Sequence, residues 1–478
     1  MVFSSVHFLL FFLSVCCLYW SLHPWLVVQN ALLAAAGIYF YWTWDWRLLG
    51  LLALVYSSTF SLAILVERHR KVGKDKAARA CFIASLAVIL GVLLTFKYSN
   101  FFIMSFCEMF GLDSERLMIR LLVPMGISFY SFMAIGYVMD VYRGKTEASR
   151  KPLDFFLFLC FMPLIAAGPI ERSDRLLPQF ASRRTFSYED GVDGFMLCCH
   201  GLFKKLVVAD RLKWYVDSVF MHGDYQNSAS VLIAMVFYTL QIYCDFSAYS
   251  DIARGCARLL GFEIMENFNY PYISTNIKDF WKRWHISLST WFRDYVYFPL
   301  GGSRVSAAKW ARNIMIVFLL SGFWHGASWT FVAWGGMHGA WMLIEHGFKF
   351  CAEKMNVAKF MGGRIGRSLA WLCTMCIVTI AWLFFRASSI SEATGLLKVL
   401  FCGQMPGTLV RLCAGMGPFF MVVSVLAIVL AMASDYLMSR CGQSTRRTWQ
   451  PMALSVFWLL CIIFLGVNSD ARFIYVQF

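Results

Sequence analysis

The chain has 478 residues, of which 59% are hydrophobic and 15% are charged, and its mean hydropathy is +0.60. Soluble domains average roughly 25% charged residues, so this balance excludes an ordinary soluble domain and predicts a polytopic membrane protein. The net charge of +15 does not indicate nucleic-acid binding, because the lysines and arginines gather in short loops between apolar runs, as the positive-inside rule describes.

Apolar runs close to the roughly 20 residues that cross a bilayer recur along the chain. They are residues 7–20, 48–66, 80–96, 121–139, 231–244, 369–385, 419–432 and 452–467. With the ambiguous segments between them, we expect about ten to thirteen transmembrane and re-entrant helices. The first run lacks a charged n-region and a small-residue cleavage site, so we expect it to be retained.

Basic residues cluster in five short loops, at residues 67–79, 142–151, 303–312, 359–367 and 439–447. The positive-inside rule assigns these loops to the cytoplasm, which predicts that the N-terminus and the C-terminus are both extracytoplasmic.

No long linker divides the chain, so we expect a single integral-membrane domain over residues 1–478. Within it, we expect residues 1–123 to form N-terminal spans, residues 124–345 a core that holds the functional site, and residues 346–478 C-terminal spans. The core is set apart because it mixes charged and aromatic residues into apolar segments, and ionisable groups at membrane depth face a protein interior or a wet cavity. The one CxxC pair, Cys373 and Cys376, has no second pair, so no metal site is expected.

The stretch QIYCDFSAYSDIARG, residues 241–255, carries Asp245 and Asp251 after an apolar run. Carboxylates in this position bind a cation, hold a histidine ring in its orientation, or take part in buried ion pairs or helix caps. Lys204 and Lys205, at the edge of an earlier run, are either contacts for a phosphorylated donor or interface anchors.

The stretch FWKRWHISLSTWFRDY, residues 280–295, predicts one amphipathic helix. Trp281, His285 and Leu288 recur at spacings of three and four and share one face, whereas Lys282 and Arg283 fall elsewhere. His285 is therefore expected to point toward the protein interior. Spacing alone favours a structural histidine whose ring nitrogens are satisfied by backbone or a carboxylate.

The stretch SGFWHGASWTFVAWGGMHGAW, residues 321–341, places two histidines in an apolar region. Gly322 and Gly326 flank His325, and small residues let helices approach closely or let the backbone break. Because both neighbouring basic loops are expected in the cytoplasm, the segment should enter the bilayer and return, with His325 inside. Histidine suits acid–base chemistry near neutral pH. On a continuous helix, His338 would lie about 220° from His325, so the two would share no face unless the glycines break the helix.

Several long motifs together resemble bacterial members of the membrane-bound O-acyltransferase family, and the alginate O-acetyltransferase type in particular. They are VPMGISFYSFMAIGYVMDVYRG, DFSAYSDIARGCARLLGFEIMENFNYPYIS, FWKRWHISLSTWFRDYVYFPLGG, GFWHGASWTFVAWGGMHG and the ending FIYVQF. The resemblance implies a ring of helices around a central tunnel, in which a cytoplasmic acyl donor meets its acceptor near the membrane centre. It also implies a bacterial inner-membrane location.

By this resemblance, His325 of the WHG motif is the essential histidine and His285 of RWHISLS is the second functional one. Candidate supporting residues are His338, Asp245, Asp251, Trp324 and Ser328. The side chains expected to attract the donor's phosphates are Lys282, Arg283 and Lys205. The resemblance further implies acetyl-CoA as donor substrate, no bound cofactor, a polysaccharide acceptor and a periplasmic SGNH-type acetyltransferase as partner.

The leading hypothesis is an integral-membrane O-acetyltransferase that modifies an alginate-like extracytoplasmic polysaccharide. Within the same class, the acceptor is alternatively peptidoglycan, cellulose or teichoic acid, the last with a D-alanyl group. A proton-coupled transporter or flippase is disfavoured because no internal repeat is visible. A non-catalytic scaffold for a polysaccharide export complex is the remaining alternative.

Overall fold

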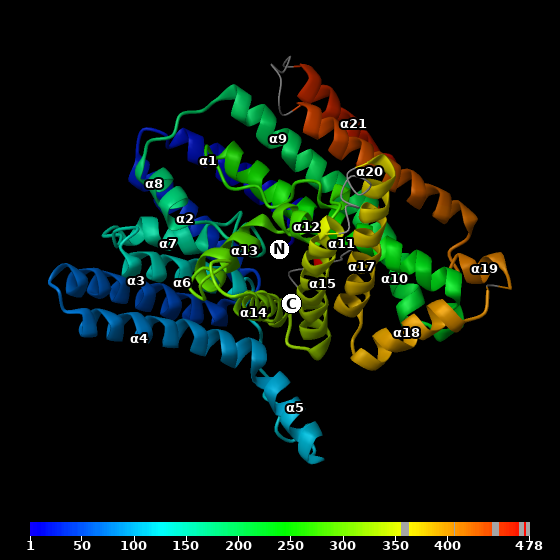
Figure 1. The fold of residues 1–478 in the computed structure, drawn as a ribbon. Helices are drawn as coiled ribbons and strands as arrows, with labels where there is room; N and C mark the ends of the chain where they lie inside the picture. The colour runs from blue at the N-terminus through cyan, green and yellow to red at the C-terminus, as the bar shows by residue number, and fades with distance from the viewer. Residues whose placement is uncertain (355–362, 406, 442–448, 468–472, 475–478) are drawn as a thin grey trace. The chain divides into compact units, whose positions relative to one another are not determined.

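The computed structural model describes residues 1–354, 363–405, 407–441, 449–467 and 473–474. Over these residues the regular secondary structure is helical, with no β-strand (Figure 1), which confirms the predicted all-α class. The basic loops predicted at residues 359–367 and 439–447, and the FIYVQF ending, lie partly outside the described residues.

The chain folds as two compact units, Met1–Cys198 with Ile252–Met265, and Cys199–Asp251 with Glu266–Phe478. Two helices have residues in both units: α9 (Tyr188–Phe203) and α11 (Ser228–Leu259). The other helices of the first unit are α1 (Val6–Ser21), α2 (Leu26–Trp42), the 3-10 turn η1 (Trp46–Leu48), α3 (Leu49–Lys71), α4 (Asp75–Leu93), the π-helical turn η2 (Leu94–Tyr98), α5 (Ser99–Phe110), α6 (Ile127–Arg143), α7 (Pro152–Cys160) and α8 (Ser173–Ala181).

The second unit contains the remaining helices. In chain order they are the π-helical turn η3 (Lys204–Ala209), α10 (Asp210–Met221), η4 (Gly223–Tyr225), η5 (Pro271–Ile273), α12 (Ile277–Arg283), α13 (Ile286–Phe292), the π-helical turn η6 (Arg293–Tyr297), α14 (Ala307–His325), α15 (Trp329–Lys354), α17 (Arg364–Arg386), α18 (Ile390–Cys402), α19 (Leu409–Leu412), α20 (Pro418–Cys441) and α21 (Trp449–Leu465).

Several helices have the length and composition of membrane spans. Among the described residues, the long ones are Trp46–Lys71, Asp75–Phe110, Ser228–Leu259, Arg364–Arg386 and Pro418–Met438, and the shorter apolar ones are Val6–Ser21, Leu26–Trp42 and Met452–Leu465. Seven of the eight apolar runs predicted from the sequence are helical in the structure. One of the seven, at residues 452–467, is helical except for its last two residues. The polytopic membrane class is thus confirmed.

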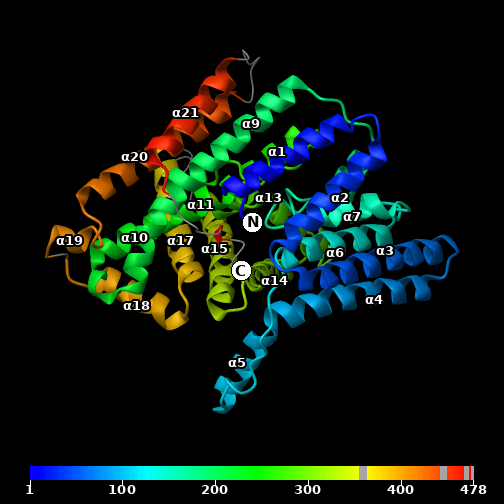
Figure 2. The ribbon, with the colours of Figure 1, turned by 180° about the vertical axis from the view of Figure 1, so that it is seen from behind.

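The run predicted at residues 121–139 begins later than expected, since α6 starts at Ile127. The chain before it is irregular, because Pro124 lacks an amide hydrogen and Gly126 adopts a left-handed φ of 69°. In the first unit, α3 and α4 lie side by side in both views, and α5 extends from the end of α4 through η2 (Figures 1 and 2).

Helices α14 and α15 of the second unit pack closely through glycines. A Cβ on Gly322 would lie 2.2 Å from the carbonyl oxygen of Phe331, and one on Gly335 would lie 2.2 Å from that of Phe318. Small residues allow this backbone approach, as in other membrane helix pairs. The contact sets the position of the end of α14, which carries His325.

We predict that Gly335→Ala destabilises the protein by about 1–3 kcal/mol, because the added methyl group must push α14 and α15 apart. The matched control is Gly347→Ala on the same helix, where a Cβ meets no atom within 4 Å; it should be neutral or stabilising by up to about 1 kcal/mol. Thermal unfolding of the detergent-solubilised variants, followed by size-exclusion chromatography, measures both. Equal stability of the two variants would contradict the packing argument.

Candidate active site

The segment predicted as one helix over residues 280–295 is broken at His285, so that prediction is wrong in its continuity. Helix α12 ends at Arg283, Trp284 is extended, and His285 adopts a left-handed conformation with φ 45° and ψ 56° before α13 begins. This conformation costs a non-glycine residue roughly 1–3 kcal/mol. The surrounding contacts must therefore hold His285 in place.

Asn267 provides those contacts. Its Oδ1 atom lies 3.1 Å from His285 Nδ1 and accepts hydrogen bonds from the Ser287 backbone N–H, at 3.2 Å, and the Ser287 hydroxyl, at 2.9 Å. Since a backbone N–H can only donate, the side-chain atom facing it is the amide oxygen. The His285 Nδ1 atom that faces the same oxygen must then carry a hydrogen. In the neutral ring, the lone pair is consequently on Nε2.

A helix break within residues 321–341, one of the two effects expected of the glycines, is present, because α14 ends at His325 and α15 begins at Trp329. Gly326 between them is extended, and a Cβ there would lie 2.1 Å from the Phe331 ring. Ser328, whose predicted support of the reaction stays a prediction, caps α15: its Oγ accepts from the Thr330 backbone N–H at 3.3 Å.

The two breaks bring His285 and His325 together. Their ring centroids are 6.3 Å apart, and the residues are 0% and 2% exposed. Trp324 lies against both rings, with centroid distances of 5.9 Å to His285 and 4.9 Å to His325. The other aromatic neighbours are Phe246 beside His285, and Trp334 and Phe385 beside His325. The pair is thus in a buried, largely apolar environment, where electrostatic interactions are stronger than in water.

His338 does not turn away from His325 as a continuous helix would require. Both histidines pack against Trp334, at centroid distances of 5.0 Å and 4.9 Å, because the helix breaks between them. His338 is fully buried beside Phe280 and Trp281. Among the described residues, neither of its ring nitrogens has a hydrogen-bond partner.

The acids and lysines upstream form buried ion pairs, one of the roles that the sequence left open. Lys205 is 1% exposed, with its Nζ 2.8 Å from carboxylate oxygens of both Asp210 and Asp245. Lys204 Nζ lies 2.6 Å from Asp251 Oδ2. The interpretation of the lysines as interface anchors is therefore wrong, and Lys205 is too enclosed to fit the predicted contact with donor phosphates.

The remaining cations predicted to contact the donor lie on α12, directly before His285. Lys282 is exposed, and Arg283 is half-buried with its Nε atom 3.1 Å from Asp279 Oδ2. The contact of these two side chains with an anionic donor stays a prediction.

Two residues that position the site were not singled out from the sequence. Asn267 lies inside one of the motifs quoted above, but nothing in its spacing indicates the contact with His285. Glu345 of α15 accepts the Ile277 backbone N–H at 3.0 and 3.1 Å and the Trp341 indole N–H at 2.9 Å. Its carboxylate therefore caps the positive end of α12.

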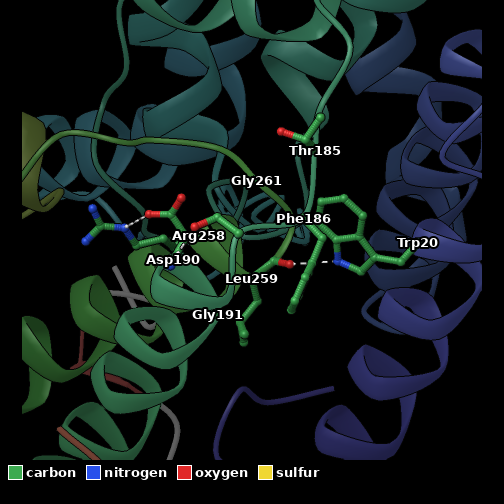
Figure 3. A pocket seen from close by; sticks show the side chains of 9 residues that line it. Trp20, Thr185, Phe186, Asp190, Gly191, Arg258, Leu259 and Gly261 are labelled. Carbon is green, nitrogen blue, oxygen red and sulfur yellow. Dashed lines mark hydrogen bonds and ion pairs between the residues drawn. The ribbon is translucent and has the colours of Figure 1, made fainter. Parts of the chain in front are cut away.

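A small pocket of the first unit does not contain this chemistry. It is lined by residues around Trp20, Asp190 and Arg258, in which the Trp20 indole donates to the Leu259 carbonyl at 3.0 Å and Arg258 pairs with Asp190 at 3.2 Å (Figure 3). Neither His285 nor His325 lines it.

Comparison with known proteins identifies the family of the chain. Residues 38–388 match the profile of MBOAT, the membrane-bound O-acyltransferase family. The chain is 38% identical to a probable alginate O-acetylase, AlgI, of Azotobacter vinelandii over 84% of this chain and 78% of that protein. It is 32% identical to a peptidoglycan O-acetyltransferase of Helicobacter pylori over 77% of this chain and 72% of that protein. A teichoic acid D-alanyltransferase of Bacillus subtilis is 30% identical over 48% of this chain and 60% of that protein.

The chain therefore belongs to the membrane-bound O-acyltransferase family. It is a membrane enzyme that transfers an acyl group to a hydroxyl, and the donors of this family are in general acyl-CoA thioesters. These findings favour an enzyme over the transporter and scaffold alternatives.

We predict that Asn267→Ala lowers the rate of acyl transfer by roughly 10²-fold, the lower end of what a positioned acid or base contributes. The variant loses the acceptor that holds the His285 tautomer and its left-handed backbone. Asn267→Asp keeps an oxygen in that place and should restore most of the rate. The control is Asn100→Ala, which removes a side chain bonded to Ile119 in the first unit.

The rates are measured with purified protein as release of free CoA from acyl-CoA. If Asn267→Ala transfers at the rate of Asn100→Ala, Asn267 does not position the reaction.

Proposed function

We propose that this protein is an O-acetyltransferase of the bacterial inner membrane, which moves acetyl groups from cytoplasmic acetyl-CoA toward an alginate-like extracytoplasmic polysaccharide. The observation that carries the proposal is the buried pair of His285 and His325, whose ring centroids are 6.3 Å apart. Relatives that cover most of the chain supply the class of reaction, since they include a probable alginate O-acetylase and a peptidoglycan O-acetyltransferase.

The proposed reaction needs a base for the acceptor hydroxyl. The hydroxyl oxygen attacks the thioester carbonyl, its proton passes to a histidine, and the C–S bond breaks with its electron pair on sulfur. We assign proton removal to His325. His285, whose lone pair Asn267 holds on Nε2, accepts a hydrogen bond from the acceptor and orients it. A sugar with two neighbouring hydroxyl groups can donate one to His325 and the other to His285 Nε2.

The surroundings of the pair suit this chemistry. Indole and phenyl rings enclose both histidines, and a water-poor site protects the thioester from hydrolysis. The backbone N–H at Gly326, next to His325, is our candidate donor to the oxyanion that forms on the carbonyl. Lys282 and Arg283 are our candidates for the contact with the phosphates of coenzyme A.

The membrane arrangement follows from charge. We propose that the basic loops face the cytoplasm, that both termini are extracytoplasmic, and that residues 124–345 form the catalytic core of one functional module. We also propose that a periplasmic SGNH-type acetyltransferase completes transfer to the polysaccharide. Other acceptors within the same class are peptidoglycan, cellulose and teichoic acid. Whether the protein transfers acetyl or D-alanyl groups is tested by supplying it with labelled acetyl-CoA in one assay and a labelled D-alanyl carrier thioester in another.

We predict that His325→Ala abolishes polysaccharide acetylation, with a loss of at least about 10²-fold, because the base is removed. The variant should still insert into the membrane, since a buried histidine contributes little to the apolar surface that the spans present to lipid. The control is His222→Ala, which changes an exposed histidine at the end of α10 and should acetylate normally.

Acetyl content of the secreted polysaccharide, with membrane protein quantified in the same cells, measures both variants. Normal acetylation by His325→Ala would contradict the assignment of the site.

A further inference from the structure

A second group of ionisable side chains lies buried in the unit that carries the two catalytic candidates. It comprises His200 of α9, Lys204 of η3, Tyr243 and Asp251 of α11, and Asp435 of α20. We call these five residues the His200 array. All but Asp251 are below 9% exposed, and the Asp251 side chain is 16% exposed.

Each member of the His200 array contacts the next. Lys204 Nζ lies 2.6 Å from Asp251 Oδ2, and the same oxygen lies 3.1 Å from His200 Nδ1. On the other side of the ring, His200 Nε2 is at an ion-pair distance of 3.4 Å from Asp435 Oδ1. The Tyr243 hydroxyl donates to Asp435 Oδ2 at 2.6 Å. The array therefore extends from an ammonium group to a phenol through contacts of at most 3.4 Å, of which the one between His200 Nε2 and Asp435 is an ion pair and not a hydrogen bond.

Other polar groups bound the array. Lys204 also donates to the Ser247 hydroxyl at 2.9 Å, and the Trp458 ring of α21 packs on His200 at 4.8 Å. Cys244 follows Tyr243 in the chain, and Arg254 lies about one turn beyond Asp251 on α11. The adjacent cation, Lys205, is paired with Asp210 and Asp245, which lie outside the array.

Hydrogen-bond chemistry indicates that the array holds a proton. A neutral imidazole would turn the lone pair of one ring nitrogen toward a carboxylate oxygen, which is repulsive. If His200 carries a hydrogen on both nitrogens, Nδ1 donates to Asp251 and the charged ring faces Asp435 as an ion pair, without a hydrogen bond from Nε2. The two cations His200 and Lys204 then balance the two anions Asp251 and Asp435, as buried charges in a low dielectric require. Alternatively, His200 is neutral and one of the two aspartates is protonated, in which case the same proton is bound to a carboxylate oxygen and not to the ring.

Such an array is costly inside a membrane protein. Buried ion pairs often stabilise a fold less than apolar side chains of the same volume. Ionisable residues within membrane helices commonly line ion or proton pathways. The cost therefore points to a function beyond holding α9, α11 and α20 together.

The phenol end of the array adjoins the catalytic candidates. The Tyr243 ring packs 5.2 Å from Tyr272 and 6.3 Å from Trp284, the residue before His285. One turn along the same face of α11, the Phe246 ring lies 4.8 Å from the His285 ring. The array thus ends at the aromatic wall of the site.

We propose that the His200 array is a proton relay for acyl transfer, a role that rests on the proposed function. In the overall reaction, the acceptor O–H and the donor C–S bonds break, and the ester C–O and thiol S–H bonds form. The electron pair of the C–S bond leaves on sulfur, and a hydroxyl lone pair forms the ester bond. In the proposed function, donor and acceptor approach from opposite faces of the membrane, so the proton released by the acceptor must travel to reach the thiolate. The array gives one proton to the thiolate and regains the one that His325 has taken from the hydroxyl, with no net change over a turnover.

The first test is the protonation state of His200 in the resting protein. Protein labelled with ¹⁵N-histidine is compared with the variant His200→Gln, and the signal lost in the variant reports the His200 ring. We expect both nitrogens to carry hydrogen, or the ring to share a proton with an aspartate. A neutral ring with one bare nitrogen and no carboxylic acid by infrared difference spectroscopy would overturn the proposal.

The second test is the rate of acetyl transfer in H₂O and D₂O across pH. Tyr243→Phe and Asp435→Asn should each slow transfer at least about tenfold, enlarge the solvent isotope effect and shift the pH profile, with the KM for acetyl-CoA unchanged. The matched control is Tyr238→Phe, a buried tyrosine of the same helix outside the array, which should keep the wild-type profile.

The outcomes separate the two proposals. Wild-type profiles in Tyr243→Phe and Asp435→Asn would overturn the relay, and a loss of thermal stability without a changed pH profile would show a structural role only. A wild-type protein that transfers no acetyl group would contradict the proposed function, and the spectra of His200 would still decide whether the array holds a proton.

Discussion

The side-chain oxygen of Asn267 is the contact on which the candidate site depends. It faces the ring of His285 and accepts both the backbone N–H and the hydroxyl of Ser287. One acceptor thereby fixes the left-handed turn between α12 and α13, the orientation of the imidazole and the nitrogen that carries its lone pair. Glu345 stabilises the same segment from the other end by capping α12. The site is preorganised because its backbone strain is offset by these buried polar contacts.

Both catalytic candidates lie where a helix is interrupted. His285 separates α12 from α13, and His325 ends α14 just before Gly326. Interrupted helices inside a membrane protein are tolerated only where protein or a cavity covers the exposed backbone. Here aromatic rings provide that cover, while Gly322 and Gly335 bring α14 against α15. The same arrangement that protects the backbone also excludes water from the histidines.

Much of the fold could be predicted from the sequence, because apolar runs of membrane length leave few options other than a helix. The break after His325 was predictable as well, since its glycines are adjacent in the chain. The break at His285 was not, because the periodicity of Trp281, His285 and Leu288 fits a continuous helix. The acceptor that breaks it, Asn267, is eighteen residues away in the chain.

Charge was the least predictable feature. Lys204 and Lys205 have the sequence pattern of residues at the edge of a span, yet carboxylates from α10 and α11 enclose them. Such pairing depends on how helices distant in sequence pack together, which periodicity does not contain. The prediction that His325 is the essential histidine came from family resemblance, and the structure adds the contacts that hold His285 beside it.

The central claim is that His285 and His325 act as one catalytic unit. Its most direct test is a double-mutant cycle on the release of CoA from acetyl-CoA by purified protein with polysaccharide fragments as acceptor. If the two act together, the double variant His285→Ala/His325→Ala loses no more rate than the more damaging single variant. Losses that multiply in the double variant would contradict a shared step.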